Sequence, residues 1–218
     1  MGVTEYALLR LRKDGHDDPD LLETLCQTNE VQDQWIDQHQ PHLREQDDNH
    51  SQFYLHEDKS EPYMLITAPW DSPEGHKAWI QSKENQEAMT KLVGPFLVEG
   101  DTDLFHMEAA VDSPQMPLKG AKISTRFNVT RLDVDAADRD AVQKEFQRLR
   151  DIPGSSSSKS QVWAGWKIEK TDKLESLIIF WIPVEQSPEV TEFLTKHGRH
   201  ETRTFRSIGH GPCGVFKV

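Results

Sequence analysis

Trp79 and His76 are the residues whose types and spacing best suit chemistry on a small molecule. They lie three positions apart in a stretch whose apolar residues recur at steps of three and four, so a helix would bring them to one side. An indole can pack against a flat aromatic ligand, and an imidazole that titrates near neutral pH can act as a general base. The alternatives are that Trp79 is only a core residue and that His76 is only an exposed polar residue.

Further polar side chains lie in two predicted strands. His106, in the strand 104–111, is a second candidate base, although the alternation of its neighbours leaves its side of the sheet open. Tyr54 and His56 alternate onto one face of the strand 52–56, where they would either line a pocket or lie on the solvated side. We therefore take His56 as a third candidate base and Tyr54 as a candidate ligand contact.

The later part of the chain adds an arginine and two tryptophans as candidate ligand contacts. Arg126 lies in a mixed strand, where a buried guanidinium could hold a phenolate or a carboxylate, and otherwise it is a surface arginine. Trp163 and Trp166 are three residues apart in one strand, so they should point to opposite faces of the sheet. We expect one of them to meet a facing sheet and the other to meet helices.

The strands and helices that must position these residues follow from the hydrophobic pattern, which predicts the order β-α-β-β-α-β twice. In residues 1–112 we expect strands at 6–12, 52–56, 63–68 and 104–111, a helix from Asp18 to about Ile36, and a helix over 73–96. Residues 113–120, with two prolines and a glycine, are typical of a linker. In residues 121–218 we expect strands at 123–131, 162–168, 177–182 and 203–208, and helices over 136–150 and from Ser187.

The repeat is also visible residue by residue. Ala68-Pro69-Trp70-Asp71-Ser72-Pro73-Glu74 matches Ile182 to Glu189 with one inserted residue, and each segment follows an apolar strand and opens a helix. One β-α-β-β-α-β unit leaves a sheet face bare, and two units bury it by stacking sheet on sheet. The prediction is an α+β fold of two ferredoxin-like halves packed as an intramolecular dimeric α+β barrel. A monomer completes this pseudo-dimer, and a homodimer stays open.

The string Trp70-Asp71-Ser72-Pro73-Glu74, followed by Trp79 and Ser82, resembles the start of the second helix in the antibiotic biosynthesis monooxygenase family. The tandem form resembles fungal proteins associated with secondary metabolism. The resemblance implies a small-molecule pocket between each sheet and its helices, and an aromatic or polyketide-derived substrate. It implies either a cofactor-free monooxygenase or a cyclase, decarboxylase or lyase. The alternative is a non-catalytic binding or interaction protein, because one fold hosts many functions.

Haem, flavin and metal are not expected. In haem-degrading relatives the axial histidine follows the tryptophan by about three helical turns, and this sequence has Met89 there. The second half has His197 at the corresponding position, but Leu194 replaces the tryptophan. His197 and His200 lack the i, i+4 spacing that places two metal ligands on one helix face.

Composition narrows the possible partners. A net charge of −12 over 218 residues, without a Lys/Arg cluster, disfavours nucleic acid and anionic membranes. Cys26 and Cys213 lie far apart and outside CxxC spacing, so we expect neither a disulfide framework nor a zinc site. The N-terminus lacks the pattern of a signal peptide, and the longest apolar run, residues 177–183, is too short to span a bilayer. We expect a cytoplasmic protein that binds a small aromatic or polyketide-like ligand.

Overall fold

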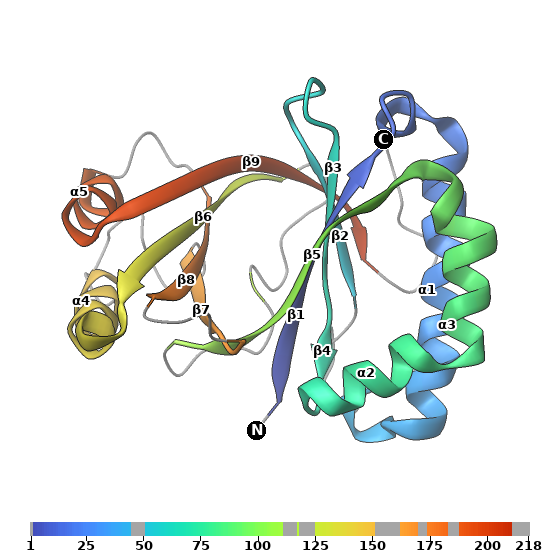
Figure 1. Cartoon of the computed structure of the whole chain (residues 1–218), viewed down its shortest axis with the longest axis horizontal. Coiled ribbons are helices and arrows are strands. Elements are labelled where there is room, and N and C mark those ends of the chain that lie inside the picture. The colour runs from blue at the N-terminus through green and yellow to red at the C-terminus, as the bar shows by residue number, and fades with distance from the viewer. Residues whose placement is uncertain are drawn as a thin grey trace.

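The centre of the molecule is a closed antiparallel barrel of eight strands with helices on two opposite sides (Figure 1). The computed structural model describes residues 2–44, 51–110, 117, 125–150, 162–169, 174–182 and 188–210. Around the barrel the strand order is β3-β2-β9-β6-β8-β7-β5-β1, and β3 pairs with β1 to close it. The short β4 pairs with one end of β1.

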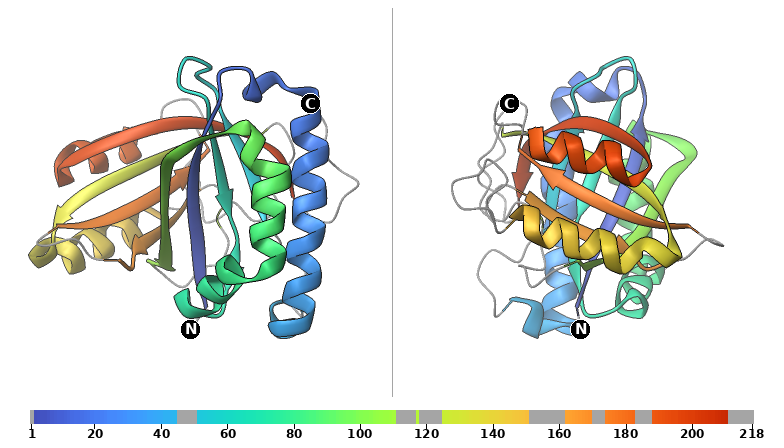
Figure 2. Two further views of the ribbon diagram at one scale, coloured as in Figure 1. Left: turned by 45° about the vertical axis from the view of Figure 1, so that its right-hand side comes forward. Right: turned by 90° about the vertical axis from the view of Figure 1, so that its left-hand side faces the viewer.

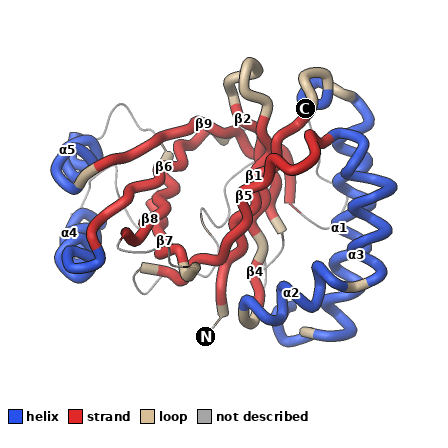
Figure 3. Tube along the Cα trace, in the orientation of Figure 1, coloured by secondary structure: helices blue, strands red, loops and turns tan. Residues whose placement is uncertain are grey.

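The first half (described from residue 2 to 110) contributes the strands β5-β1-β3-β2, in that spatial order. Helices α1, α2 and α3 cover the outer face of these strands, as the blue helices on one flank of Figure 3 show. The elements are β1 (Val3–Leu11), α1 (Pro19–His39), β2 (Gln52–His56), β3 (Tyr63–Thr67), β4 (Pro69–Trp70), α2 (Pro73–Gln81), α3 (Lys83–Ala88) and β5 (Leu97–Ala109).

The second half (described from residue 125 to 210) repeats this spatial order as β9-β6-β8-β7. Its helices lie side by side across the outer face of these strands (Figure 2). The elements are β6 (Arg126–Asp135), α4 (Arg139–Arg150), β7 (Val162–Lys167), β8 (Leu174–Trp181), α5 (Pro188–His197) and β9 (Arg199–His210). Pairing of β2 with β9 and of β5 with β7 joins the halves. The predicted linker, 113–120, lies outside the described residues apart from residue 117.

The segment 73–96, predicted as one helix, is interrupted at Ser82, whose backbone is extended (ψ 151°). Its hydroxyl accepts a hydrogen bond from the backbone N–H of Asn85 and so caps α3. A π-helical turn at Met89–Val93 and a 3₁₀ turn at Gly94–Phe96 follow. The apolar periodicity continues through the break because both helical segments face the same sheet.

The strand expected at 104–111 begins earlier than predicted, at Leu97.

Side chains from both halves pack in the interior of the barrel, beside a hollow of about 220 Å³ that Tyr6, Phe105 and Ile178 help to line. The rings of Tyr6 and Phe105 stack at 4.4 Å between centroids, and Tyr54 meets Phe127 edge-on at 4.8 Å. The contacts between the two sheets therefore form a packed aromatic core.

Cys26, on α1, is disulfide-bonded, whereas the sequence led us to expect no disulfide framework. No helix in the described part of the chain is long and apolar enough to cross a membrane.

Candidate active site

A cavity of about 240 Å³ lies between the first-half sheet and helices α1, α2 and α3. Most of its lining is apolar, with a few amide, hydroxyl and titratable groups, as is usual for small-molecule sites. Thr102 and Leu104 of β5 line it and are exposed, so the cavity opens along this strand. The lining residues are Glu5, Ala7, Leu9, Leu25, Thr28, Gln32, Phe53, Ile66, His76, Trp79, Ile80, Asn85, Met89, Val93, Leu97, Thr102 and Leu104.

A buried carboxyl group, Glu5, lies in the wall of this cavity. Strand alternation places it on the same face of β1 as Ala7 and Leu9, and it is 7% exposed. Burial raises the pKa of Glu5 to about 7, although the Trp70 indole N–H, which donates to Oε2 at 2.9 Å, favours the charged form. Glu5 can therefore gain or lose a proton near neutral pH, as a general base must.

His76 lies beside Glu5, with its Nε2 at 3.3 Å from Glu5 Oε2. Ser72 caps the N-terminus of α2 and fixes the first turn, where His76 stacks on the Trp70 indole at 4.6 Å. His76 is 2% exposed, and burial, aided by the charge of His106, lowers its pKa to about 3. The imidazole of His76 is therefore neutral at physiological pH.

The hydrogen bonds continue from His76 away from the cavity. His76 Nδ1 lies 2.9 Å from His106 Nε2, and His106 Nδ1 lies 2.6 Å from Glu169 Oε1. The backbone N–H of His106 donates to Glu169 Oε2 at 2.9 Å. Burial alone would raise the pKa of Glu169, but these hydrogen bonds outweigh it and lower the pKa, so Glu169 is ionised. Glu169 follows β7 and thus belongs to the second half.

Trp79 also lines the cavity, one helical turn after His76. Its indole packs against the Trp35 indole of α1, with ring centroids 5.5 Å apart. Trp79 is 5% exposed, so it is both a core residue of the helical layer and part of the cavity wall. The two interpretations left open by the sequence are compatible.

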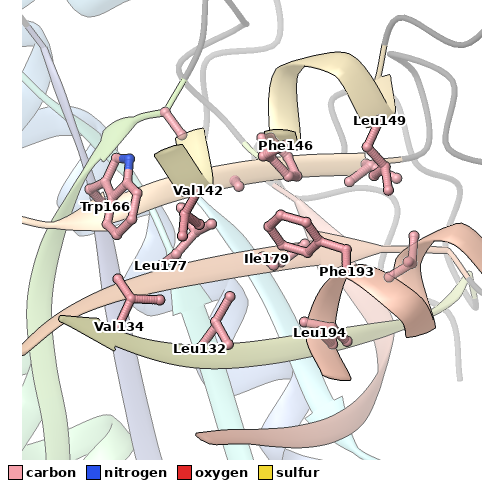
Figure 4. Packing of buried hydrophobic residues seen from close by; sticks show 14 residues of the cluster. Leu132, Val134, Val142, Phe146, Leu149, Trp166, Leu177, Ile179, Phe193 and Leu194 are labelled. Atoms are coloured by element: carbon pink, nitrogen blue, oxygen red, sulfur yellow. The ribbon is translucent and has the colours of Figure 1, made fainter. Parts of the chain in front are cut away.

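The corresponding space in the second half is filled. Figure 4 shows Phe146 of α4 and Phe193 of α5 meeting above Ile179 of β8, and Trp166 of β7 lies in the same cluster. The Phe146 and Phe193 rings are 6.1 Å apart, and both are at most 3% exposed. These side chains occupy the position that the cavity has in the first half.

Of the predicted site residues, His76 and Trp79 line the cavity, and His106 is hydrogen-bonded to His76. His56 lies elsewhere: its Nδ1 bonds to the Glu61 carbonyl at 2.8 Å, and its ring packs on Phe205. His56 is buried, and it lines a separate surface hollow together with Glu61 and Glu201.

The other predicted ligand contacts also lie away from the cavity. Tyr54 is in the barrel interior, with its hydroxyl bonded to Gln52. Arg126 is a surface residue, 71% exposed, and pairs with Glu57 at 3.0 Å. Trp163 and Trp166 face opposite sides of their sheet, as their spacing predicts: Trp163 lies in the barrel interior, and Trp166 under α4 donates to Gln143 at 2.9 Å.

Glu5 and Glu169 are the residues that the sequence analysis missed. Glu5 had a signal, because it is a carboxylate on an apolar strand face that continues through Ala7 and Leu9. Glu169 lies in a polar stretch after β7, and nothing in its neighbours distinguishes it.

The described residues contain no group of three or more His, Cys, Asp or Glu side chains arranged to hold a metal ion. The thioether side chain of Met89 lines the cavity.

The sequence matches no family model and no curated protein. Solved structures do resemble the chain. A predicted monooxygenase from Lactobacillus acidophilus NCFM superposes with a TM-score of 0.58 over 96% of this chain and 95% of that protein, at 10% identity. A predicted monooxygenase from Fusobacterium nucleatum gives 0.59 over 98% and 95%, at 8% identity. An anthrone oxidase-like protein gives 0.56 over 99% and 95%, at 10% identity.

The shared fold is the dimeric α+β barrel. The likeness covers nearly the whole chain, so the barrel and its two helical flanks are common to these proteins. In this barrel Glu5 and His76 line a cavity of the first half.

Proposed function

We propose that the protein is a cofactor-free oxygenase that uses Glu5 as its general base on a small aromatic, polyketide-derived substrate. The observation that carries this proposal is the buried Glu5 carboxyl, with a pKa of about 7, in the wall of a mostly apolar cavity. A base with a pKa near the working pH transfers protons most effectively. The anthrone oxidase-like neighbour supports an aromatic ketone as the substrate class.

The proposed reaction can be written for anthrone. Glu5 removes a proton from the methylene carbon between the rings, and the resulting carbanion gives an electron to dioxygen. Recombination forms a carbon–oxygen bond and, after protonation, a hydroperoxide. Loss of water from this hydroperoxide breaks the oxygen–oxygen bond and the second methylene C–H bond. Anthrone and dioxygen thus give anthraquinone and water, and Glu5 ends in its starting state.

An oxygen electrode tests this proposal directly. Anthrone added to the protein should cause oxygen uptake above the spontaneous rate, with anthraquinone formed in equal amount and detected by its absorbance. Product formation from an aromatic polyketide without oxygen uptake would instead assign cyclisation or decarboxylation, which need the same base. Binding of the ligand without any conversion would identify a binding protein. A cavity that holds a titratable group favours the enzyme over that alternative.

The proposed function includes the arrangement of the chain. We propose a tandem of two ferredoxin-like halves, 1–112 and 121–218, joined by the linker 113–120, which works in the cytoplasm in secondary metabolism. The strand order repeated in β5-β1-β3-β2 and β9-β6-β8-β7 supports the tandem. The first half would hold the active cavity, and the second would complete the barrel.

Trp79 should govern how tightly an aromatic substrate binds. Replacing Trp79 with leucine keeps apolar bulk but removes the flat ring, and aromatic pairing contributes about 0.5–1.5 kcal/mol. We expect Trp79→Leu to raise the KM for anthrone about tenfold at the upper end of this range. Trp79→Phe, the matched control, should stay within about twofold of the wild type. Steady-state oxygen uptake measures both, and equal KM values in the two variants would remove Trp79 from the binding site.

A further inference from the structure

The hollow inside the barrel, of about 220 Å³, lies between the strands of the two halves and shares no lining residue with the cavity around Glu5. Strand alternation separates the two spaces, because Leu8 of β1 faces into the barrel whereas Ala7 and Leu9 face the helices. Its rim carries charged side chains that are partly or fully exposed, so the hollow opens to solvent at a mouth of the barrel, a common position for ligand sites. Its floor is apolar and includes Leu8, Phe105, Val129 and Ile178.

The rim brings charges of opposite sign from the two halves to the same space. The second half contributes Arg131 of β6 and Arg203 of β9, and the first half contributes Asp103 of β5. Arg131 Nη1 lies 3.8 Å from Asp103 Oδ2, which is beyond hydrogen-bond distance, so both groups keep hydrogen-bonding capacity. Arg131 Nε donates to Asp133 at 3.0 Å, and this contact uses only one of its five N–H groups.

The other charged groups at the rim are paired with each other. Asp101 lies 3.1 Å from Arg10 Nη1, and Glu201 lies 2.7 Å from Arg203 Nη2. The three arginines and four carboxylates of the rim leave one net negative charge, which disfavours a simple anion. A ligand that carries one positive and one negative charge leaves this balance unchanged and meets a partner for each charge.

Tyr6 places a further hydrogen-bond donor in the wall of the hollow. It is 7% exposed, its ring stacks on Phe105, and its hydroxyl has no hydrogen-bond partner among the described residues. Burial raises the pKa of Tyr6, and the nearby charge of Arg203 only partly offsets this, so the hydroxyl keeps its hydrogen. Exposed ion pairs alone would account for the rim, but a buried donor that faces an open space points to a ligand.

We propose that this hollow is a second ligand site, which binds a zwitterionic small molecule of the α-amino acid class with an apolar side chain. The carboxylate of the ligand accepts hydrogen bonds from Tyr6 and Arg203, and its ammonium group donates to Asp103. The side chain of the ligand lies on the apolar floor. The volume is below the range of about 300–1,000 Å³ for drug-sized ligands, so it suits one small molecule. This site does not depend on the proposed reaction at Glu5.

Calorimetric titration of the full chain with matched ligands tests the requirement for both charges. L-phenylalanine carries both, 3-phenylpropanoate lacks the ammonium group, and 2-phenylethylamine lacks the carboxylate. Hydrogen bonds to charged groups are the strong ones, so each analogue should bind at least about tenfold more weakly than L-phenylalanine. L-leucine, a smaller amino acid, should also bind. Equal affinity for either analogue would overturn the proposal, as would the absence of binding by both amino acids at millimolar concentrations.

Methyl-labelled isoleucine shows where the ligand binds. Ile178 lines the hollow, whereas Ile66 and Ile80 line the cavity around Glu5. The ring of bound L-phenylalanine should shift the methyl signals of Ile178 and leave those of Ile66 and Ile80 in place. Shifts confined to Ile66 and Ile80 would overturn the proposal. This measurement needs no turnover, so its result is independent of whether anthrone is converted.

Two variants and a matched control complete the test. Tyr6→Phe removes the hydroxyl but keeps the ring on Phe105, and it should weaken L-phenylalanine binding about tenfold. Asp103→Asn should abolish the preference for L-phenylalanine over 3-phenylpropanoate, a selectivity that a merely structural role of Asp103 would not affect. Glu99→Gln removes an exposed carboxylate of β5 that lines neither space, and it should bind like the wild type. Wild-type affinity and selectivity in both Tyr6→Phe and Asp103→Asn would overturn the proposal.

Discussion

Glu5→Gln is expected to lower kcat for anthrone oxidation by at least about 100-fold, because a positioned general base contributes about 10²–10⁴ to rate. Glutamine matches Glu5 in shape. With its oxygen in the position of Glu5 Oε2, it can still accept the hydrogen bond of the Trp70 indole N–H. The variant should therefore fold and bind ligand, and lose only the capacity to take a proton. Oxygen uptake at saturating anthrone measures the loss.

A matched variant on a neighbouring strand separates loss of the base from loss of charge. Glu108→Gln removes a carboxylate on β5 that lies outside the cavity lining, and it should keep wild-type turnover. If Glu5→Gln retained more than about a tenth of the wild-type kcat, a general-base role of Glu5 would be excluded.

Glu5→Gln should also stabilise the protein, and the gain should depend on pH. The folded-state pKa of Glu5 is about 7 against an ordinary value of 4.5, so the folded protein binds the proton more tightly than the unfolded chain. The contribution of the Glu5 proton to the free energy of unfolding is fully present below pH 4.5, and it is lost as the pH rises through 7. A shift of this size corresponds to about 3 kcal/mol. Glu5→Gln has no such proton to lose, so its free energy of unfolding at pH 8 should exceed that of the wild type by about 3 kcal/mol.

Urea unfolding of both proteins at pH 5 and pH 8 measures the effect. The difference in free energy of unfolding between variant and wild type should grow by about 2.5 kcal/mol between these conditions, because pH 5 already lies above the ordinary pKa of 4.5. The lowered pKa of His76 reduces the free energy of unfolding at acid pH in both proteins. This contribution therefore cancels in the difference between them. A difference that is the same at both pH values would show that Glu5 titrates normally in the folded protein.

Local pattern was enough to predict most elements of the fold. The strand Gln52–His56 was predicted at its observed bounds, and the start of α2 followed from Ser72 and Pro73, since capping and proline preference act within one turn. The interruption at Ser82 could not be predicted in the same way. A serine within a periodic helix can either continue it or cap a new one, and packing of both segments on the sheet decides.

The site was less accessible because it depends on contacts between distant segments. His76 and His106 are thirty positions apart and meet only because β5 pairs with β1 beside the start of α2. Each could be nominated alone, but their pairing could not. His56 shows the opposite error: alternation placed it correctly on its strand, yet a nearby backbone carbonyl satisfies its ring nitrogen. Strand period does not reveal such partners.

The filled core under α4 and α5 has a consequence for how the chain can change over time. In a symmetric dimer of identical subunits, one substitution alters both cavities at once, so neither can be closed while the other is kept. A single chain that encodes both halves removes this coupling. Phe146 and Phe193 can therefore occupy one site with large rings while Ala7 and Leu9 leave the other open. Selection can then act on rigidity in one half and on chemistry in the other.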